Sequence, residues 1–386
     1  MEIDLRRWIS GEAKAMAQKP KIAEILEKHH GEKLLVVLHN YPDPDAISAA
    51  FAHKLISAEY GIDVDIMYPS KISYGQNIAL VKLLGIDLIP YKPGMELGQY
   101  QGAIFLDHQG ATANGIVKAL EEAGIPVLIV VDHHEPQEVV RAVYSDIQKT
   151  GATATIYAGY LAQELIILQK DQKEHIALAT ALMHGILTDT NGFVRADQED
   201  FLSAAFLSQF SDPNLLEQIM DQARSKQVMD VIRRALENRT VVENHSIAGI
   251  GYLRSEDRDA IPQAADFLVN EENVHTAIVY GIVRDDNQIE MLTGSLRSTK
   301  LIFDPDEFIK QVFGTNSDGQ FYGGGKHLAG GFNIPIEFLA GEPNEEYLGL
   351  KWQVFDTQVK TKIFNRIGVK MQSVTSRKNN IHIHPF

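Results

Sequence analysis

Apolar and polar positions in the first half of the chain follow two alternating patterns. Short apolar runs bounded by turn residues are typical of buried strands, and four such runs cover residues 33–40, 64–69, 102–110 and 127–135. Stretches with helical periodicity cover residues 46–60, 77–84, 111–123, 153–168 and 173–187. This alternation predicts an α/β fold whose parallel sheet carries helices on both faces. Ligands of such sheets bind at the carboxyl ends of the strands.

The second half of the chain begins with a helical pattern. Residues 213–238 are predicted to form one long amphipathic helix. HSIAGIGYL, HTAIVYGIVRD and IEMLTGSLRS then alternate like strands and lead into a glycine-rich loop, YGGGKHLAGGF. We therefore expect a larger domain over residues 1–212, a linker helix over 213–238, a smaller α/β domain over 239–340 and an extension over 341–386 to which no element is assigned.

Composition and charge narrow the classes of partner. The 386 residues include 36 Lys and Arg against 51 Asp and Glu, a net charge of −15, which argues against binding of duplex DNA. The absence of cysteine excludes thiolate chemistry. The first 30 residues lack the apolar region of a signal peptide, and no apolar run approaches the ~20 residues that cross a bilayer. We expect a cytoplasmic protein with no membrane partner, and a homodimer is left open.

Ionisable side chains stand where the predicted strands end. The run 127–135 leads into Asp132, His133 and His134, and the run 102–110 leads into Asp107. Burying unpaired ionisable groups is costly, so these side chains need partners or a solvated strand end.

Two further segments carry candidate ligands. His39, Asp43 and Asp45 follow the first strand with two prolines between them, a spacing that can bring one imidazole and two carboxylates to one point. The alternative is a plain turn in which Asp45 caps the next helix. Asp189 lies in a turn after a helical segment, in GILTDTNGF, where a lone Asp is often only a turn residue.

Carboxylates gathered at one sheet edge repel one another unless cations neutralise them. Two divalent metals ~3.5–4 Å apart, bridged by a carboxylate and a hydroxide, would resolve this repulsion. Mixed His and Asp ligands favour Mn²⁺, with Mg²⁺, Co²⁺ or Zn²⁺ as alternatives.

These segments resemble the motifs of the DHH phosphoesterase superfamily. VVDHHE is similar to the motif that names it, HNYPDPDAIS to its first motif, LDHQG to its second and ILTDTNGF to its fourth, in the family's order. GGGKHLAGG, residues 323–331, resembles the hallmark of the associated DHHA1 domain. The resemblance covers residues 33–335 and points to the branch of nanoRNases and 3′-phosphoadenosine 5′-phosphate phosphatases.

The resemblance implies a role for each residue of the candidate centre. Two metal ions would be bound, the first by His39, Asp43 and Asp107, and the second by Asp107, Asp45, His133 and Asp189. Asp132 would orient an imidazole through its ring N–H. His134 would face the scissile phosphate as a hydrogen-bond donor and acid.

For the second domain the resemblance implies contacts to the substrate. The backbone of Gly323, Gly324 and Gly325 would bind an anion or nucleotide, His327 would contact a phosphate or base, and Arg297 is predicted to clamp a distal phosphate. A tight turn is the alternative for the glycines. Lys326 stands where the family has a fourth glycine, so it either adds a phosphate contact or narrows the pocket. His108, unusual after the second-motif Asp, is either a bystander or an additional contact.

The expected function is metal-dependent hydrolysis of short nucleotides in a cleft between two domains. Substrates would be short oligoribonucleotides, linear dinucleotides or 3′-phosphoadenosine 5′-phosphate. The alternatives are a pyrophosphatase or polyphosphatase, a RecJ-like single-strand exonuclease, and a non-catalytic nucleotide sensor on the same fold.

Overall fold

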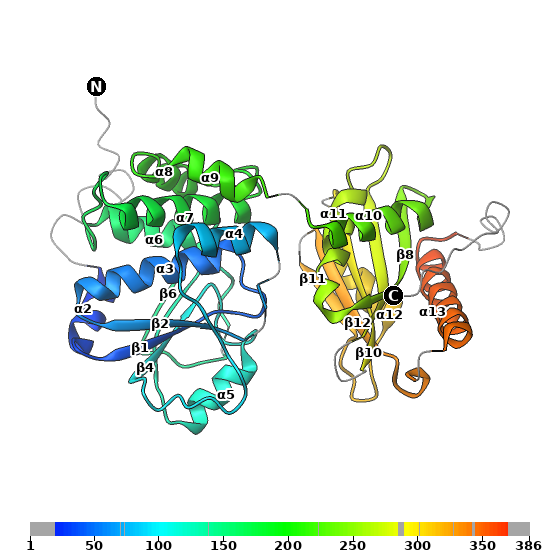
Figure 1. The fold of residues 1–386 in the computed structure, drawn as a ribbon, viewed down its shortest axis with the longest axis horizontal. Coiled ribbons are helices and arrows are strands. Elements are labelled where there is room, and N and C mark those ends of the chain that lie inside the picture. Colours follow the sequence, from blue (N-terminus) through cyan, green and yellow to red (C-terminus); the bar gives the residue numbers. More distant parts are fainter. Residues whose placement is uncertain are drawn as a thin grey trace. The chain divides into compact units, whose positions relative to one another are not determined.

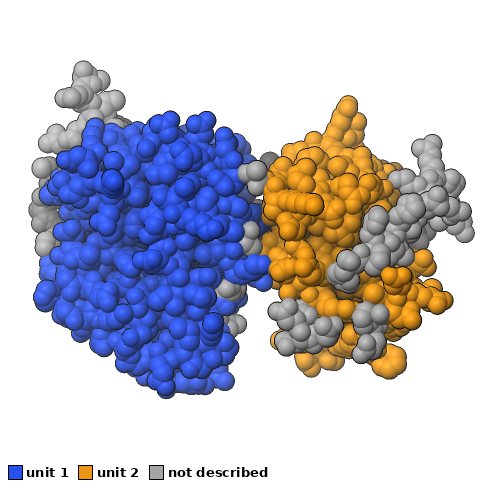
Figure 2. Space-filling view, in the orientation of Figure 1, with its two compact units in different colours: residues 1–223 blue, residues 224–386 orange. Residues whose placement is uncertain are grey.

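The chain divides into two compact units. The computed structural model describes residues 20–369 except 70, 73, 138, 223, 285–288, 301, 327, 342 and 343. Unit 1 is Met1–Ala223 and unit 2 is Arg224–Phe386 (Figure 2). The boundary therefore falls inside the segment expected as a linker. Within the described residues, no helix is long and apolar enough to cross a membrane.

Unit 1 is built on a six-stranded parallel sheet in the order β3-β2-β1-β4-β5-β6. The four predicted strands are confirmed as β1 (Lys33–Val37), β2 (Asp63–Tyr68), β4 (Gly102–Leu106) and β5 (Val127–Asp132). Two strands were not predicted, β3 (Ile89–Pro90) and β6 (Tyr144–Ile147). They are short and only partly buried, so they lack an apolar run that the sequence would reveal.

Helices cover both faces of this sheet, as predicted (Figure 1). The helices of unit 1 are α2 (Lys21–Leu26), α3 (Pro44–Glu59), α4 (Gly75–Leu84), α5 (Asn114–Glu122), α6 (Thr153–Ala162), α7 (Lys173–Asp189), α8 (Gln198–Leu207) and α9 (Pro213–Met220), with a 3-10 turn η1 (Glu27–His29). Alternate strand residues point to opposite faces. Leu34 and Val36 pack with the core of α3, α6 and α7, whereas Leu35 and Val37 pack with that of α5.

The strand order places the candidate residues at one point. From β1 the chain moves outward to β2 and β3, and it then returns to β4 on the other side of β1 before moving to β5 and β6. Crevices form where the order reverses in this way, at the carboxyl ends of the strands. The loops that follow β1 and β4 therefore diverge from the same crevice.

Unit 2 contains a mixed six-stranded sheet in the order β11-β12-β10-β9-β8-β7. Its strands are β7 (Thr240–Val242), β8 (His245–Arg254), β9 (Thr276–Arg284), β10 (Glu290–Ser298), β11 (Gly323–Lys326) and β12 (Ala329–Pro335). The helices α10 (Lys226–Asn238) and α11 (Ala260–Leu268) share one apolar cluster with the sheet, and α12 (Pro305–Phe313) and α13 (Glu345–Arg366) share another. Short 3-10 turns are η2 (Ser255–Asp257) and η3 (Glu337–Leu339).

Two expectations about the second half of the chain were wrong, and a helix lies in the extension to which no element was assigned. The single helix over 213–238 is two helices, because Ser225 caps α10 through the Val228 N–H after a break that follows Met220. The glycine-rich loop is a pair of strands, β11 and β12. The extension includes α13, whose Trp352 and Ile363 are buried in the core of unit 2. Residues 370–386 lie outside the described part.

Candidate metal centre

Two aspartates after β1 start two different helices. Asp43 is the N-cap of α3, since its Oδ1 accepts the Ala46 N–H at 3.0 Å and Pro44 follows at the first helical position. Asp45 does not cap α3, in contrast to the alternative considered above. Its fully buried carboxylate accepts the N–H groups of Thr153 and Ala154, each at 2.7 Å, at the start of α6. The two carboxylates thus point in separately fixed directions.

Asp107 follows the end of β4 with a left-handed backbone, at φ 61°. A residue other than glycine seldom adopts this conformation, and such strain often marks a functional site. Its Oδ2 lies 3.4 Å from His39 Nε2, and its Oδ1 lies 3.4 Å from His133 Nε2. Thr153 Oγ1 also donates to Asp107 Oδ1 at 3.1 Å. Asp107 therefore stands between the two histidines.

Backbone carbonyls fix the orientation of both histidines. His39 Nδ1 lies 2.8 Å from the carbonyl oxygen of Asn40, and His133 Nδ1 lies 3.1 Å from that of Thr150. A carbonyl only accepts, so each Nδ1 carries the proton and each Nε2 is free to act as a ligand. His133 Nε2 is buried and has no hydrogen-bond partner among the described residues. A buried ring nitrogen without a hydrogen-bond partner is suited to bind a metal ion.

The structure brings together all six predicted metal ligands. They form two groups, and within each group the ligand atoms lie within 4.8 Å of one another. The groups are His39, Asp43 and Asp107, and Asp45, His133 and Asp189. A third such group is Asp107, His133 and His134. Asp189 reaches the centre as the last residue of α7 rather than from a turn, with Oδ2 3.2 Å from His133 Nε2. The donor set of imidazoles and carboxylates fits divalent cations.

The electrostatics of the centre favour positive charge. Burial and the charges of Asp107 and Asp189 raise the pKa of Asp45 well above its usual range. Burial also raises the pKa of Asp189 to about 6. Burial alone would lower the pKa of His133, but nearby Asp189, Asp45 and Asp107 outweigh it and raise the pKa to about 10. Carboxylates held this close attract protons or metal ions.

Asp132 orients His134 rather than a predicted metal ligand. Its Oδ1 accepts from the His134 backbone N–H at 3.1 Å and lies 2.8 Å from His134 Nδ1. Burial would raise the pKa of Asp132, but these hydrogen bonds and that of Gln109 lower it. The His134 side chain is 36% exposed, and its Nδ1 is held by Asp132, so Nε2 is the ring nitrogen left to contact a substrate.

Sequence reasoning missed Gln109, which ties the ends of β4 and β5 together. Its amide donates to Asp132 Oδ2 at 2.8 Å and to the Glu135 carbonyl at 3.2 Å, while its carbonyl accepts the Gln137 N–H at 2.6 Å. Only its place two residues after Asp107 could have signalled it. His108 beside it is a bystander: its Nε2 donates to the Val37 carbonyl, its Nδ1 accepts the Gly110 N–H, and its ring stacks on Phe105.

Sequence reasoning also missed the segment from Thr150 to Ala154. Its carbonyl and N–H groups contact His133 and Asp45, and the Thr153 hydroxyl contacts Asp107. Contacts made by backbone groups cannot be predicted from residue identity, because nearly all residues share the same backbone groups. The available signal was the start of a helical pattern at GATAT, where free N–H groups attract a carboxylate.

In unit 2 the predicted cations share one row of the sheet. Arg297 and Lys326 both lie opposite Ala329, on strands at either side of β12. Side chains at opposed positions point to the same face, so the two cations face the same way. Arg297 Nε pairs with Asp266 Oδ1 at 2.6 Å. His327 lies outside the described residues.

Gly324 and Gly325 pack closely against the start of α12, whereas Gly323 packs against Gly331 and Phe332 of β12. The Gly325 N–H donates to Asp306 Oδ1 at 3.0 Å, so in this structure it is not free for an anion. A Cβ at position 325 would lie 2.7 Å from the Ala329 carbonyl oxygen and 2.9 Å from Pro305 Cβ. The glycines therefore have a packing role in addition to any binding role.

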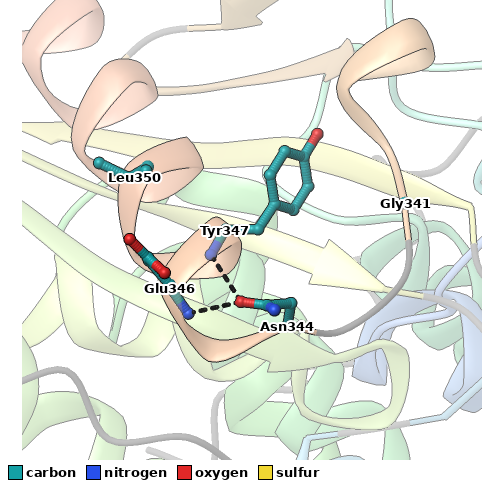
Figure 3. Close-up of a pocket in the computed structure, with 5 residues that line it drawn as sticks. All are labelled: Gly341, Asn344, Glu346, Tyr347 and Leu350. Atoms are coloured by element: carbon teal, nitrogen blue, oxygen red, sulfur yellow. Dashed lines mark hydrogen bonds between the residues drawn. The ribbon is translucent and has the colours of Figure 1, made fainter.

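A surface pocket at the start of α13 lacks comparable chemistry (Figure 3). Its lining residues are Gly341, Asn344, Glu346, Tyr347 and Leu350. Asn344 Oδ1 accepts the N–H groups of Glu346 at 3.0 Å and Tyr347 at 3.2 Å, which is an ordinary helix cap. With one carboxylate and no histidine among these residues, the pocket does not compete with the candidate centre.

The comparisons with known proteins agree with the geometry. A family model described as the DHH family, N-terminal domain, matches residues 33–186. An uncharacterized protein of Methanocaldococcus jannaschii is 34% identical over 351 residues, which cover 89% of this chain and 67% of that protein. The chain belongs to the DHH family. Members of the DHH family are phosphoesterases, and residues 33–186 include every predicted ligand except Asp189.

Solved structures resemble this DHH-family chain in fold. An exopolyphosphatase-related protein from Bacteroides fragilis is 18% identical with a TM-score of 0.62, over 88% of this chain and 96% of that one. RecJ from Thermus thermophilus, solved in complex with Mn²⁺, is 12% identical with a TM-score of 0.43, over 94% of this chain and 63% of that one. The second likeness is too distant to support an inference about this chain.

Proposed function

We propose that this chain is a divalent-metal-dependent phosphohydrolase that acts on short nucleotides. One observation carries the proposal: Asp107 belongs to the first ligand group through an oxygen that faces His39, and its other oxygen lies 3.4 Å from His133 of the second group. A carboxylate shared in this way suits a bridging ligand between two ions. The proposed activities are exonuclease cleavage of short oligoribonucleotides and dephosphorylation of 3′-phosphoadenosine 5′-phosphate.

The residues present would bind two ions and position a phosphate. His39 and Asp43 would hold one ion, Asp45, His133 and Asp189 the other, and Asp107 both. When bound, the ions, Mn²⁺ by preference, would lower the pKa of a shared water and neutralise charge on phosphoryl oxygens. The hydrogen bond of Nδ1 to Asp132 would hold the His134 ring in place, and Nε2 would donate to the scissile phosphate.

Charge supports a short substrate over a long one. The net charge of −15 disfavours long nucleic-acid backbones, which are bound by displacing counterions with many Lys and Arg side chains. This argument weighs against a RecJ-like exonuclease. Arg297 and Lys326, on one face of the sheet in unit 2, supply a small number of cations, which suits one or two phosphates. The complete ligand set weighs against a non-catalytic sensor.

Hydrolysis of pyrophosphate or polyphosphate is the second candidate. The Bacteroides fragilis protein is named for a relation to exopolyphosphatases, and its fold matches over 88% of this chain. The same metal centre would serve either substrate class. The hairpin β11–β12, with its glycines and Lys326, favours the nucleotide proposal because its sequence resembles a DHHA1 motif.

A substrate panel with the purified chain and Mn²⁺ tests the proposal. The panel comprises a diribonucleotide, 3′-phosphoadenosine 5′-phosphate, pyrophosphate and a long single strand. We expect hydrolysis of the first two to dominate. His133→Ala should reduce turnover by more than about 100-fold, since even the loss of a hydrogen-bond partner of a metal ligand costs about 10–100-fold. Asp132→Ala should also reduce turnover, because it removes the hydrogen bond that orients His134.

His175→Ala is the matched control, because His175 lies in unit 1 outside the candidate centre and should leave turnover unchanged. Preference for pyrophosphate would replace the nucleotide proposal by the second candidate. Equal turnover of His133→Ala and the unsubstituted chain would overturn the site itself.

A further inference from the structure

We propose that Asp200, on α8, is a positioning residue that holds the metal-ligating side chains in place through the segment Thr150–Thr153. This inference rests on the proposed metal centre. Asp200 lies outside every motif of the sequence and contacts none of the six candidate ligands. Its effect would pass through backbone hydrogen bonds, as the partners of metal ligands commonly act.

Asp200 is a fully buried carboxylate that accepts hydrogen bonds from several elements. The Gly151 N–H donates to both of its oxygens at 3.1 Å, and Thr155 Oγ1 donates to Oδ1 at 2.5 Å. The Asp197 N–H donates to Oδ2 at 2.9 Å. A buried carboxylate is retained only when its oxygens are satisfied in this way. Gly151 belongs to the segment Thr150–Thr153, and Thr155 lies in the first turn of α6.

That segment in turn contacts three of the candidate ligands. The Thr150 carbonyl accepts from His133 Nδ1, the Thr153 N–H donates to Asp45, and the Thr153 hydroxyl donates to Asp107. Gly151, which Asp200 binds, lies between Thr150 and Thr153. A shift of Gly151 would therefore displace partners of both ion groups at once.

The contact between Gly151 and Asp200 is close enough to exclude a side chain. A Cβ at position 151 would overlap the Asp200 carboxylate and would lie 2.6 Å from Thr190 Cγ2. Gly151 has no left-handed backbone, so the glycine is needed for proximity rather than for conformation. Such fits between backbone and carboxylate keep a segment in one position.

A helix-capping role alone would also explain part of this arrangement. Asp197 is the N-cap of α8, and Asp197 and Asp200 form a reciprocal capping box. Capping would need only the bond to the Asp197 N–H. The bonds of Asp200 to Gly151 and Thr155 lie outside the helix and point to the second role. Asp197 accordingly provides a control that loses the cap and keeps the contact to Gly151.

Binding of Mn²⁺ to the full chain tests the proposal, by calorimetry alongside thermal melting and steady-state kinetics. Asp200→Asn keeps the side-chain shape but turns one acceptor into a donor facing the Gly151 N–H. Gly151→Ala pushes the segment away and leaves the capping box intact. We expect both variants to raise the Mn²⁺ dissociation constant about tenfold, and to lower kcat more than they change KM for the nucleotide.

Asp197→Ala should lower the melting temperature and leave the Mn²⁺ dissociation constant unchanged. The proposal is overturned if Gly151→Ala and Asp200→Asn bind Mn²⁺ as tightly as Asp197→Ala does. Should Asp200→Asn not fold, Gly151→Ala decides alone. If the unsubstituted chain binds no Mn²⁺, both the proposed metal centre and this inference are wrong. If the unsubstituted chain binds Mn²⁺ and the variants bind it equally tightly, only the role of Asp200 is wrong and the metal centre stands.

Discussion

Five buried or largely buried histidines of unit 1 have shifted pKa values, in directions that depend on the carboxylates around them. Burial lowers the pKa of His53 to about 3, and those of His108 and His184 to about 4, because a buried imidazolium loses its hydration. His39 and His133 are also largely buried, yet nearby Asp side chains raise the pKa of each. In the candidate centre, carboxylates thus favour positive charge on buried histidines, whereas burial disfavours it on His53, His108 and His184.

The buried histidines predict a loss of stability in acid. The pKa of His184 is about 4 in the folded chain and ~6.5 in an unfolded one. As pH falls through this window, the unfolded chain takes up a proton that the folded chain does not. The free energy of unfolding should therefore fall by up to about 1.4 kcal/mol per pH unit for this residue. Urea denaturation of His184→Leu should show a smaller loss between pH 6.5 and 4 than the unsubstituted chain.

At pH 7.5 position 184 is neutral in both the unsubstituted chain and His184→Leu. The difference between their free energies of unfolding at that pH is therefore the control, since it reports packing alone. An equal slope of unfolding free energy against pH in the two chains would refute the assignment of a neutral, buried His184. Neither ring nitrogen of His184 has a hydrogen-bond partner among the described residues, which is consistent with that assignment.

At the scale of elements, the hairpin β11–β12 depends on its glycines to approach α12. Gly330 and Gly325 are opposed in the register, and a Cβ at 330 would lie 2.5 Å from Ile309 Cδ1 on α12. A Cβ at 325 would meet backbone atoms, the Ala329 carbonyl and the Asp306 nitrogen at 3.0 Å. Backbone cannot move away as a flexible side chain can.

Gly325→Ala is therefore expected to destabilise unit 2. Overpacking of a close contact costs about 1–3 kcal/mol, and denaturant unfolding of the full chain measures the change. Gly331→Ala is the matched control on the partner strand, since its Cβ would meet only the Gly294 carbonyl oxygen, at 3.3 Å. The packing account is contradicted if the alanine at 331 destabilises the chain as much as the alanine at 325.

Across the whole molecule, the features that could be predicted are those encoded in apolar patterns and in side-chain identity. The parallel sheet followed from buried strand runs, and candidate ligands such as Asp107 and His133 followed from charged residues at strand ends. Contacts made through the backbone could not be foreseen, as at Thr150, whose carbonyl binds His133. Asp200 was missed because its partner Gly151 is 49 residues away in the chain. The hairpin β11–β12 was taken for a loop because glycine has low strand propensity.

In the proposed centre, Asp107 joins two metal sites in unit 1. Asp189 belongs to the ligand group of Asp45 and His133 and not to that of His39, Asp43 and Asp107. Removing it should therefore abolish one site and spare the other, which has its own His39 and Asp43.

The most direct measurement is the number of Mn²⁺ ions bound per chain, by calorimetry or elemental analysis after equilibrium dialysis, for the unsubstituted chain and for Asp189→Ala. We predict two ions for the first and one for the second. A single ion or none in the unsubstituted chain, or two ions retained by Asp189→Ala, would contradict the account.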